Sequence, residues 1–384
     1  MTTSLRGSTA IVGAALAGIP AMPPGSTAID AMALASMLAV EDAGIRLSDI
    51  DAIFAAGLQT FMPTLSLSEY LGINPRYSDA TQIGGGAFIA HLNHAQAAIA
   101  AGLCDVALIA YGSTQKSDGA KFTSRSEPDL YESPYKLPGP VGAYALITQR
   151  HMHEFGTTRE QLAEIAVASR LWARMTPGAA ATDPLSLDEV MEARMVSTPL
   201  TVRDCCLVTD GGGAVIVTSA ERARHLKQPP VYVLGVGEAV SHRSISSMPD
   251  FTTTLATQSG ARAFAQAGLK PSDIDVAQLY DAFTIMPLLF LEDLGFCKKG
   301  EAGAFVDSGS IRPGGAFPMN TNGGGLSFGH PGMYGIFTVI ESVLQLRGTC
   351  GARQVASAQV ALAHGPGGFM SSQSTAIFGT EHTL

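Results

Sequence analysis

The sequence predicts an α/β protein made of two duplicated halves, with a mainly helical insertion in the first half. Three observations lead to this prediction. They are a sequence repeat in fixed order, a composition typical of a well-buried chain with many tight turns, and a segment between the repeats where charged residues and prolines cluster. The 384 residues exceed what one small core needs and suffice for two related halves with an insertion.

The repeat begins with AVEDAGIRLSDIDAIFAAG, which matches AFAQAGLKPSDIDVAQLYDAF in the second half. In both copies Ala-Gly ends a helix and S-D-I-D leads into an apolar strand; Gly44 and Gly268 suit the left-handed conformation that closes a helix. A second match follows in the same order. The Gly-rich turn and helix at 84–102 precede DVALIAYGS, and those beginning near Gly329 precede VASAQVALAHG. Two ordered matches favour a tandem duplication.

These matches set the predicted boundaries. The N-terminal half covers residues 1–228, and the C-terminal half covers 229–384, where VYVLGVGEAV is expected to be the first strand after the linker HLKQPP. The insertion covers 116–203, where clustered charges and prolines gather before the strand DCCLVTDGGGAVIVTS.

Local signals add detail to this outline. Thr157-x-x-Glu160 and Ser186-x-x-Glu189 are typical of capping boxes, so they predict two helix starts in the insertion. The N-terminal STAIVGAALAGIPAMPP is interrupted by glycine and proline and lacks a clean cleavage site, which favours a buried strand over a signal peptide. The longest apolar candidate for a membrane span, AFTIMPLLFL, is about half the needed length.

Composition excludes several classes of partner. Hydrophobic residues make up 46% and charged residues 15%, with 42 glycines, which argues against disorder. The net charge of −9 disfavours nucleic acid and anionic membrane surfaces. Five cysteines without a disulfide framework indicate a reducing cytoplasm.

Titratable residues in the second half follow strands or flank glycine turns. They are Tyr280 and Asp281 in QLYDAF, His330 in NTNGGGLSFGHPGMYG, and His364 in ALAHGPGGFMSS. A histidine directly after a buried strand and before glycines is well placed to face a pocket at the strand ends. Each residue alone is more often structural, but a duplicated framework brings all three stretches toward one corner.

The chain resembles the thiolase superfamily from about Thr9 to Gly379. G-H-P is the most specific element, and A-L-A-H-G-P-G-G and DCCLVTDGGGA are similar to the sterol-carrier-protein branch. This resemblance implies a five-layered αβαβα fold, usually dimeric, that acts on coenzyme A thioesters.

The resemblance also implies roles for individual residues. His330 is the G-H-P histidine, and His364 takes the position of the C-terminal acid/base. Tyr280 stands where relatives carry Asn or His. Backbone N–H groups at Gly85 and Gly367 are the expected donors to an oxyanion.

The nucleophilic cysteine of an ordinary thiolase is missing. Its position falls at Gly85, or at Ile83 or Gly84 in a shifted alignment, and none of these can form a thioester. The remaining histidines and tyrosine suit proton transfer beside a thioester carbonyl. We therefore expect non-covalent enolate chemistry, such as aldol or retro-aldol cleavage of a β-hydroxyacyl-CoA. The Y-D-A-F motif resembles that of actinobacterial thiolase-like aldolases acting on steroid side chains, although those relatives lack G-H-P.

Two alternatives stay open. The first is an acyltransferase of the acetyl-CoA acetyltransferase or 3-ketoacyl-CoA thiolase type that uses Cys205 or Cys206, although an adjacent pair entering a strand is more often packing. The second is a non-catalytic module that binds acyl-CoA or lipid. A nucleotide-binding loop is disfavoured, because GGG lacks both G-x-G-x-x-G spacing and a Walker lysine.

Binding partners follow from the same resemblance. Coenzyme A is expected as part of the substrate, with no tightly bound cofactor. A homodimer is expected, together with an OB-fold and zinc-ribbon accessory protein like that of the aldolase relatives. No metal site is expected, because His91 and His94 lack an apparent third ligand. The basic residues best placed in the insertion for the coenzyme A phosphates are Lys116, Lys121, Arg125, Lys136 and Arg150.

Overall fold

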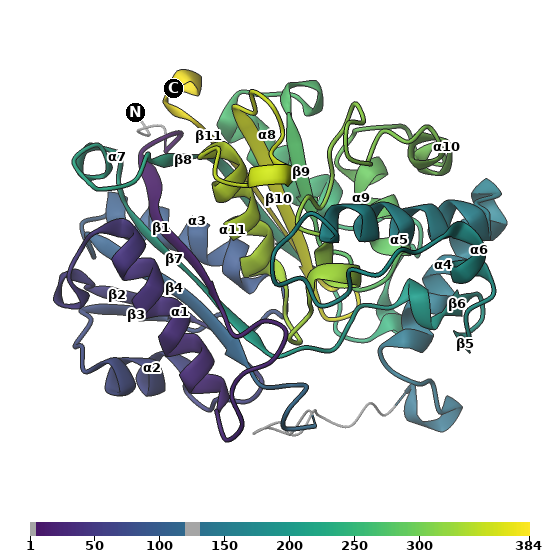
Figure 1. Cartoon of the computed structure of the whole chain (residues 1–384), viewed down its shortest axis with the longest axis horizontal. Helices are drawn as coiled ribbons and strands as arrows, with labels where there is room; N and C mark the ends of the chain where they lie inside the picture. The colour runs from purple at the N-terminus through teal and green to yellow at the C-terminus, as the bar shows by residue number, and fades with distance from the viewer. Residues whose placement is uncertain (1–4, 120–130) are drawn as a thin grey trace.

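The computed structural model describes residues 5–119 and 131–384. Within these residues, nine strands form one mixed sheet in the order β3-β2-β4-β7-β1-β8-β11-β10-β9 (Figure 1). The strands of the first half are β1 (Thr9–Ala17), β2 (Ala52–Ala55), β3 (Tyr77–Asp79), β4 (Val106–Ser113) and β7 (Gly211–Ser219). The strands of the second half are β8 (Val231–Val240), β9 (Val276–Leu279), β10 (Val360–Gly367) and β11 (Ser372–Gly379).

The two halves meet at an antiparallel seam, where Ala10 and Ile11 of β1 pair with Tyr232 and Val231 of β8. Outward from this seam, β7, β4 and β2 follow β1, while β11, β10 and β9 follow β8. In each half the first two pairings are antiparallel and the next is parallel. Equivalent strands therefore share order and direction, which confirms the predicted duplication.

Helices complete the five layers that the resemblance implied. The helices of the first half are α1 (Ala28–Ala43), α2 (Pro63–Leu71), α3 (Ala87–Ala100) and the short α7 (Ala220–Ala223). Those of the second half are α8 (Ala256–Ala267), α9 (Ile285–Asp293), α10 (Ala302–Asp307) and α11 (Gly335–Leu346). α1 packs on the outer face of the first half and α8 on that of the second, while α3 and α11 contact strands of both halves from between them (Figure 1).

Glycines in the two first strands explain how the outer helices pack so closely. A Cβ on Gly13 of β1 would lie 2.2 Å from the carbonyl oxygen of Ala39 in α1. A Cβ on Gly235 of β8 would lie 2.1 Å from the carbonyl oxygen of Ala263 in α8. Any side chain at either position would push its helix off the sheet, so the same packing device recurs in both halves.

Most predicted helix ends are confirmed. Gly44 and Gly268 close α1 and α8 in the left-handed conformation, with φ of 69° and 65°. Ser186 forms the predicted capping box with Glu189. The box predicted at Thr157 was wrong by one residue: Thr158 caps the helix together with Gln161, because the glutamine side chain reaches back to the cap N–H.

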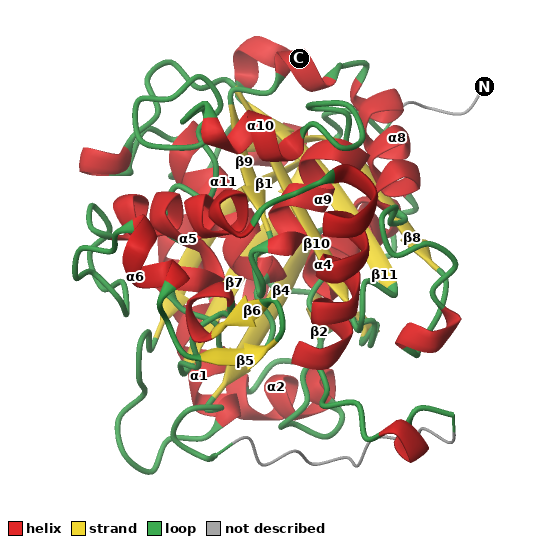
Figure 2. Cartoon of the chain, turned by 90° about the vertical axis from the view of Figure 1, so that its right-hand side faces the viewer, coloured by secondary structure: helices red, strands yellow, loops and turns green. Residues whose placement is uncertain are grey.

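The insertion is mainly helical, as predicted, and lies on one side of the molecule beside α9 and α10 (Figure 2). Its elements are α4 (Val141–Phe155), α5 (Arg159–Ala173), α6 (Leu187–Met191) and the small hairpin of β5 (Met195–Ser197) and β6 (Leu200–Thr201). Two polar side-chain contacts, one of them buried, fasten it to the core. His151 lies 3.1 Å from Glu292, and Arg159 lies 2.7 Å from Asp204.

No helix within residues 5–119 and 131–384 is both long and apolar enough to cross a membrane.

A polar cluster links the two halves behind the Gly-rich turn. His94 on α3 lies 2.6 Å from Asp79 at the end of β3 and 3.2 Å from Glu238 on β8. The hydrogen bond to Glu238 and then that to Asp79 raise the pKa of His94, although burial opposes them. The neighbouring His91 is fully buried, and burial lowers its pKa to about 4. His94 is thus the cation of the cluster, and it joins strands from opposite halves.

Replacing His94 by glutamine should therefore lower the free energy of unfolding by about 1 kcal/mol in mildly acidic solution. A histidine whose pKa is raised by folding stabilises the protein below its unfolded pKa, about 6.5, and loses that contribution as pH rises through the folded value. Urea unfolding of both proteins at about pH 6 and about pH 9 measures the difference. His91 acts in the opposite sense but is common to both proteins. An equal loss at both pH values would contradict the role of the charge.

Candidate active site

Two glycine segments from opposite halves touch through their backbones. Gly84, Gly85 and Gly86 lead into α3, and they face the turn that ends β10. A Cβ on Gly84 would lie 2.7 Å from the Cα atom of Gly367, and one on Gly86 would lie 2.5 Å from the carbonyl oxygen of Gly365. The approach is so close that only glycine fits on both sides.

Tyr280 fills the space where a side chain at position 85 would stand. A Cβ on Gly85 would lie 2.4 Å from Cε2 of Tyr280 and 2.8 Å from its hydroxyl oxygen. These separations are shorter than any normal carbon contact. The phenol therefore occupies the volume that a nucleophilic side chain would need, at the position where the sequence predicts the missing cysteine.

The hydroxyl group of Tyr280 is hydrogen-bonded to His330. Its oxygen lies 2.9 Å from Nε2 of His330, and the backbone N–H of Tyr334 donates to the same oxygen at 3.2 Å. The ring of Tyr334 also stacks on that of His330, with centroids 6.1 Å apart. Two of the three predicted catalytic side chains thus lie in direct contact.

The direction of this hydrogen bond follows from the partners. Because the oxygen of Tyr280 accepts from the Tyr334 amide, its own proton is free to point at Nε2 of His330. Burial lowers the pKa of His330 to about 4, so the imidazole is neutral near pH 7 and its Nε2 accepts. Burial also raises the pKa of Tyr280. The pair is consequently a neutral phenol and a neutral imidazole that share one proton.

Asp281 anchors the loop that leads to His330. Its carboxyl group accepts from the backbone N–H of Gly325 at 2.6 Å and from that of Leu326 at 3.3 Å. A Cβ on Gly325 would lie 3.2 Å from both the carboxyl group of Asp281 and the ring of His330, so the two groups flank this glycine. Burial raises the pKa of Asp281 to about 8.

Tyr111 at the end of β4 fixes the other side of the loop. Its hydroxyl group donates to the carbonyl oxygen of Pro331 and accepts from the backbone N–H of Met333 at 3.1 Å. The residue is buried and comes from the first half of the chain. The G-H-P turn is therefore held from both halves, which fixes the position of the imidazole.

His364 does not join this group. Its Nδ1 lies 2.9 Å from Oγ1 of Thr375 and its Nε2 lies 2.9 Å from Oε1 of Gln373, while its ring packs edge-on against Phe290. The next residue, Gly365, faces the Tyr280 ring, and side chains alternate along a strand. His364 therefore lies on the opposite face of β10, toward α8 and α9. The expected gathering of three side chains at one corner is met by two, and the acid/base role of His364 stays a prediction.

The cysteines are poorly suited to nucleophilic attack. Cys205 and Cys206 follow the insertion, and the backbone N–H of Cys206 donates to the carbonyl oxygen of Ala282 at 2.8 Å. Burial raises the pKa of Cys205 to about 11 and that of Cys206 further. Both remain thiols at neutral pH, and the thiol rather than the thiolate is a weak nucleophile. Burial raises the pKa of the other three in the same direction: Cys104, Cys297 and Cys350.

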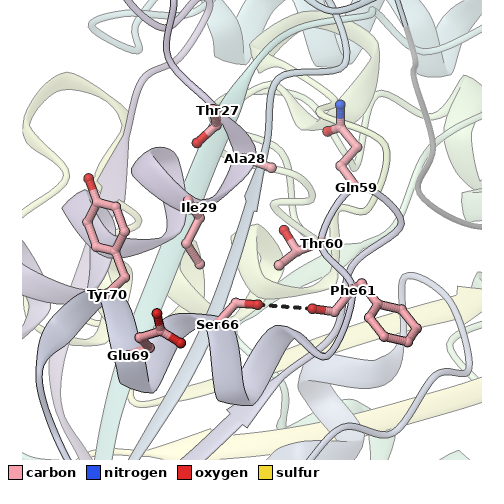
Figure 3. Close-up of a pocket in the computed structure, with 9 residues that line it drawn as sticks. All are labelled: Thr27, Ala28, Ile29, Gln59, Thr60, Phe61, Ser66, Glu69 and Tyr70. Carbon is pink, nitrogen blue, oxygen red and sulfur yellow. Dashed lines mark hydrogen bonds between the residues drawn. The ribbon is translucent and has the colours of Figure 1, made fainter.

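Two surface hollows lie away from Tyr280 and His330. One of about 570 Å³ opens between the start of α1 and α2, with Phe61 at its rim (Figure 3). Its lining residues are Thr27, Ala28, Ile29, Gln59, Thr60, Phe61, Ser66, Glu69 and Tyr70. The other, of about 840 Å³, lies along α4 and includes Arg150.

The structure describes three of the five predicted phosphate-binding cations. Lys116, Lys136 and Arg150 are exposed, so each is accessible to a ligand, whereas Lys121 and Arg125 lie outside the described residues. Their role toward coenzyme A stays a prediction. Among the described residues no cluster of three or more His, Cys, Asp or Glu side chains has a metal-binding arrangement.

Sequence reasoning missed three residues of the site. Tyr334 lies four positions after the predicted histidine, in the same motif, and its spacing was the available signal. Asp281 was noted as titratable but not as the anchor of the His330 loop. Tyr111 ends an apolar strand far away in the sequence, and no local pattern distinguishes it from a core tyrosine.

Comparisons with known proteins identify the family of the chain. The family model described as thiolase C-terminal domain-like matches residues 237–380. The acetyl-CoA acetyltransferase of Methanothermobacter thermautotrophicus is 35% identical over 91% of the chain and 94% of its own length. The chain belongs to the thiolase superfamily. Sterol carrier protein 2 of Oryctolagus cuniculus, 35% identical over 65% of the chain and 48% of its own length, supports the sterol-carrier-protein-type branch.

One further relative and one solved structure carry lyase or aldolase names. The 17-hydroxy-3-oxo-4-pregnene-20-carboxyl-CoA lyase of Mycobacterium tuberculosis is 35% identical over 81% of the chain and 84% of its own length. The solved structure described as the Ltp2-ChsH2(DUF35) aldolase is 29% identical, covers all of both chains and superposes with a TM-score of 0.90. The similarity to that structure therefore extends over the whole fold.

Acid unfolding of this thiolase-like chain should depend on His364. Burial lowers its pKa to about 3, so its neutral form stabilises the fold above the unfolded pKa of about 6.5, and this contribution is lost as pH falls below that value. Changing His364 to glutamine should reduce the slope of unfolding free energy against pH by about 1.4 kcal/mol per pH unit between about pH 4 and 6, one proton fewer. Urea unfolding at several pH values measures the slope. An unchanged slope would show that His364 already titrates normally in the fold.

Proposed function

We propose that this protein is an enzyme that cleaves, or in reverse forms, a carbon–carbon bond of a β-hydroxyacyl-CoA by aldol chemistry without a covalent acyl intermediate. One observation carries the proposal: the hydroxyl group of Tyr280, hydrogen-bonded to His330, stands where a nucleophilic side chain would otherwise be. A phenol paired with an imidazole moves protons rather than acyl groups. The lyase and aldolase names of the relatives support the same reaction class.

In the cleavage direction, the proton of the substrate's β-hydroxyl group passes to the Tyr280 oxygen while the phenol proton moves to His330. The bond between the α and β carbons then breaks. Its electrons form an enolate on the thioester, and the β carbon leaves as a ketone or aldehyde. The α carbon finally takes the proton back, so that no oxidant or other reactant is required.

The enolate needs preorganised positive charge. α3 begins at Ala87, two residues after Gly85, whose Cβ position lies 2.8 Å from the Tyr280 hydroxyl oxygen. A helix N terminus carries about half a positive charge. Backbone N–H groups at Gly85 and Gly367 are the proposed donors to the thioester oxygen. The contact of the two glycine segments supports this assignment, because it brings both backbones to one place.

An acyltransferase is the second candidate, favoured by the name of the Methanothermobacter thermautotrophicus relative. It requires a thiolate within reach of a base. Cys206 is the nearest candidate because it lies beside Asp281, but its raised pKa opposes the role. A module that only binds acyl-CoA or lipid does not account for the hydrogen bond between Tyr280 and His330.

The assembly we propose is a homodimer in the cytoplasm, with acyl-CoA as substrate and no tightly bound cofactor. The solved aldolase with TM-score 0.90 is described together with a DUF35 protein. That description supports an accessory protein of the OB-fold and zinc-ribbon kind for this chain as well.

Changing Tyr280 to phenylalanine tests the proposed reaction. The variant removes only the hydroxyl group, so turnover of a β-hydroxyacyl-CoA should fall by roughly a hundred-fold to ten-thousand-fold while substrate binding is retained. Release of ketone or aldehyde from a panel of β-hydroxyacyl-CoAs, assayed with intact-mass analysis of the protein, measures both turnover and any acyl adduct. We expect product from the wild type without an adduct.

Tyr232→Phe is the matched control. This tyrosine is also buried, on β8, and its hydroxyl group has no hydrogen-bond partner in the described structure. It should keep wild-type turnover. A stable acyl adduct on a native cysteine would instead establish the transferase, and coenzyme A binding without any turnover would establish a binding module.

A further inference from the structure

We propose that residues 85 and 280 form an exclusive pair that determines the reaction class of this site: glycine at 85 admits the phenol, and the phenol keeps a nucleophile out. The inference deepens the proposed function, but its test detects covalent acylation and does not depend on aldol turnover. It concerns one volume, which either the Tyr280 ring or a side chain on residue 85 occupies.

The first step is steric. A Cβ at position 85 would lie 2.4, 2.8 and 2.9 Å from three atoms of the Tyr280 ring and hydroxyl group. Even alanine is therefore excluded unless the ring moves. A cysteine would need still more room, since its sulfur extends beyond the Cβ atom.

The second step is that packing and hydrogen bonds hold the Tyr280 ring in its position. Tyr280 is 5% exposed, and its backbone N–H donates to the carbonyl oxygen of His364 at 3.0 Å. Its hydroxyl group is held by His330 and by the Tyr334 amide, and the Tyr334 ring packs edge-on against it at 5.7 Å. On the other side, a Cβ on Gly365 would already lie 3.2 Å from its Cδ2 atom. Three sides of the ring are thus fixed by packing and hydrogen bonds.

The third step concerns the surroundings of a thiol placed in the volume that the Tyr280 side chain now fills. The Tyr280 oxygen lies 2.8 Å from the Cβ position of residue 85 and 2.9 Å from Nε2 of His330, so a sulfur placed there would stand beside a neutral imidazole. The position also lies one residue before Gly86, the N-terminal cap of α3. A helix N terminus and a neighbouring base both favour the thiolate.

The covalent step then balances without another reagent. The thiol proton of the introduced cysteine moves to His330, and the sulfur attacks the carbonyl carbon of an acyl-CoA. The bond from that carbon to the sulfur of coenzyme A breaks. Coenzyme A leaves with the proton as a free thiol, and the acyl group remains on the protein.

The experiment compares Gly85→Cys, Tyr280→Ala and the double variant Gly85→Cys/Tyr280→Ala with the wild type. Each is incubated with acetyl-CoA, and intact-mass analysis measures the fraction carrying one acetyl group. We expect roughly tenfold or more adduct in the double variant than in any of the others, because only there is a nucleophile present and its space free. Gly85→Ser/Tyr280→Ala is the matched control, since a hydroxyl group in the same place is far less nucleophilic near neutral pH.

An adduct of equal yield on Gly85→Cys alone would overturn the proposal, because both side chains would then fit together. A folded double variant without an adduct would overturn it as well. If the double variant does not fold, thermal melting of Gly85→Ala in the wild-type and Tyr280→Ala backgrounds replaces the mass measurement. The melting temperature should fall by several degrees in the first background and by at most about half as much in the second. Equal falls would overturn the proposal.

Discussion

The contact between the two glycine segments is the constraint on which the site depends. Gly84 to Gly86 belong to the first half and Gly365 to Gly368 to the second, and they meet with separations that no Cβ atom tolerates. This contact closes the layer of α3 and α11 between the halves at one end. It also sets how far the end of β9 lies from the start of α3, which is the distance that Tyr280 spans. The Tyr280 ring reaches position 85 because the two glycine segments beside it are in direct backbone contact.

The elements around this contact hold the loop that carries His330. Asp281 fixes the turn before His330 and Tyr111 fixes the turn after it, one from each half. The segment that follows the insertion joins them, since the backbone N–H groups of Cys206 and Leu207 donate to Ala282 and Gly325. Cys206 therefore contacts the site through its backbone. The side chains of Cys205 and Cys206 serve packing, which agrees with the raised pKa of both thiols.

The sequence was sufficient for the fold because its signals are local and repeated. Gly44 and Gly268 mark helix ends through backbone conformation alone, and the two S-D-I-D segments show the duplication directly. The site was harder to predict from the sequence. Tyr280 and His330 could be predicted from motifs, but their hydrogen bond depends on the packing of α11. The face on which His364 lies depends on strand register, where one residue decides the side. The exclusion of a side chain at position 85 arises from a ring that is distant in the sequence, and no pattern along the chain encodes it.

Burial of the site explains why its ground state carries so little charge. His330 and Tyr280 are both held neutral by desolvation, and the shared proton can shift between them at small cost only if a negative charge develops nearby to balance the imidazolium. In the proposed reaction, an enolate forming at the N terminus of α3 supplies that balance, because the negative charge and the protonated histidine appear together in a low-dielectric site. A thiolate mechanism would instead place a permanent anion there before any substrate had bound. The same burial that disfavours a resting thiolate thus favours a reaction in which opposite charges are created and removed in one turnover.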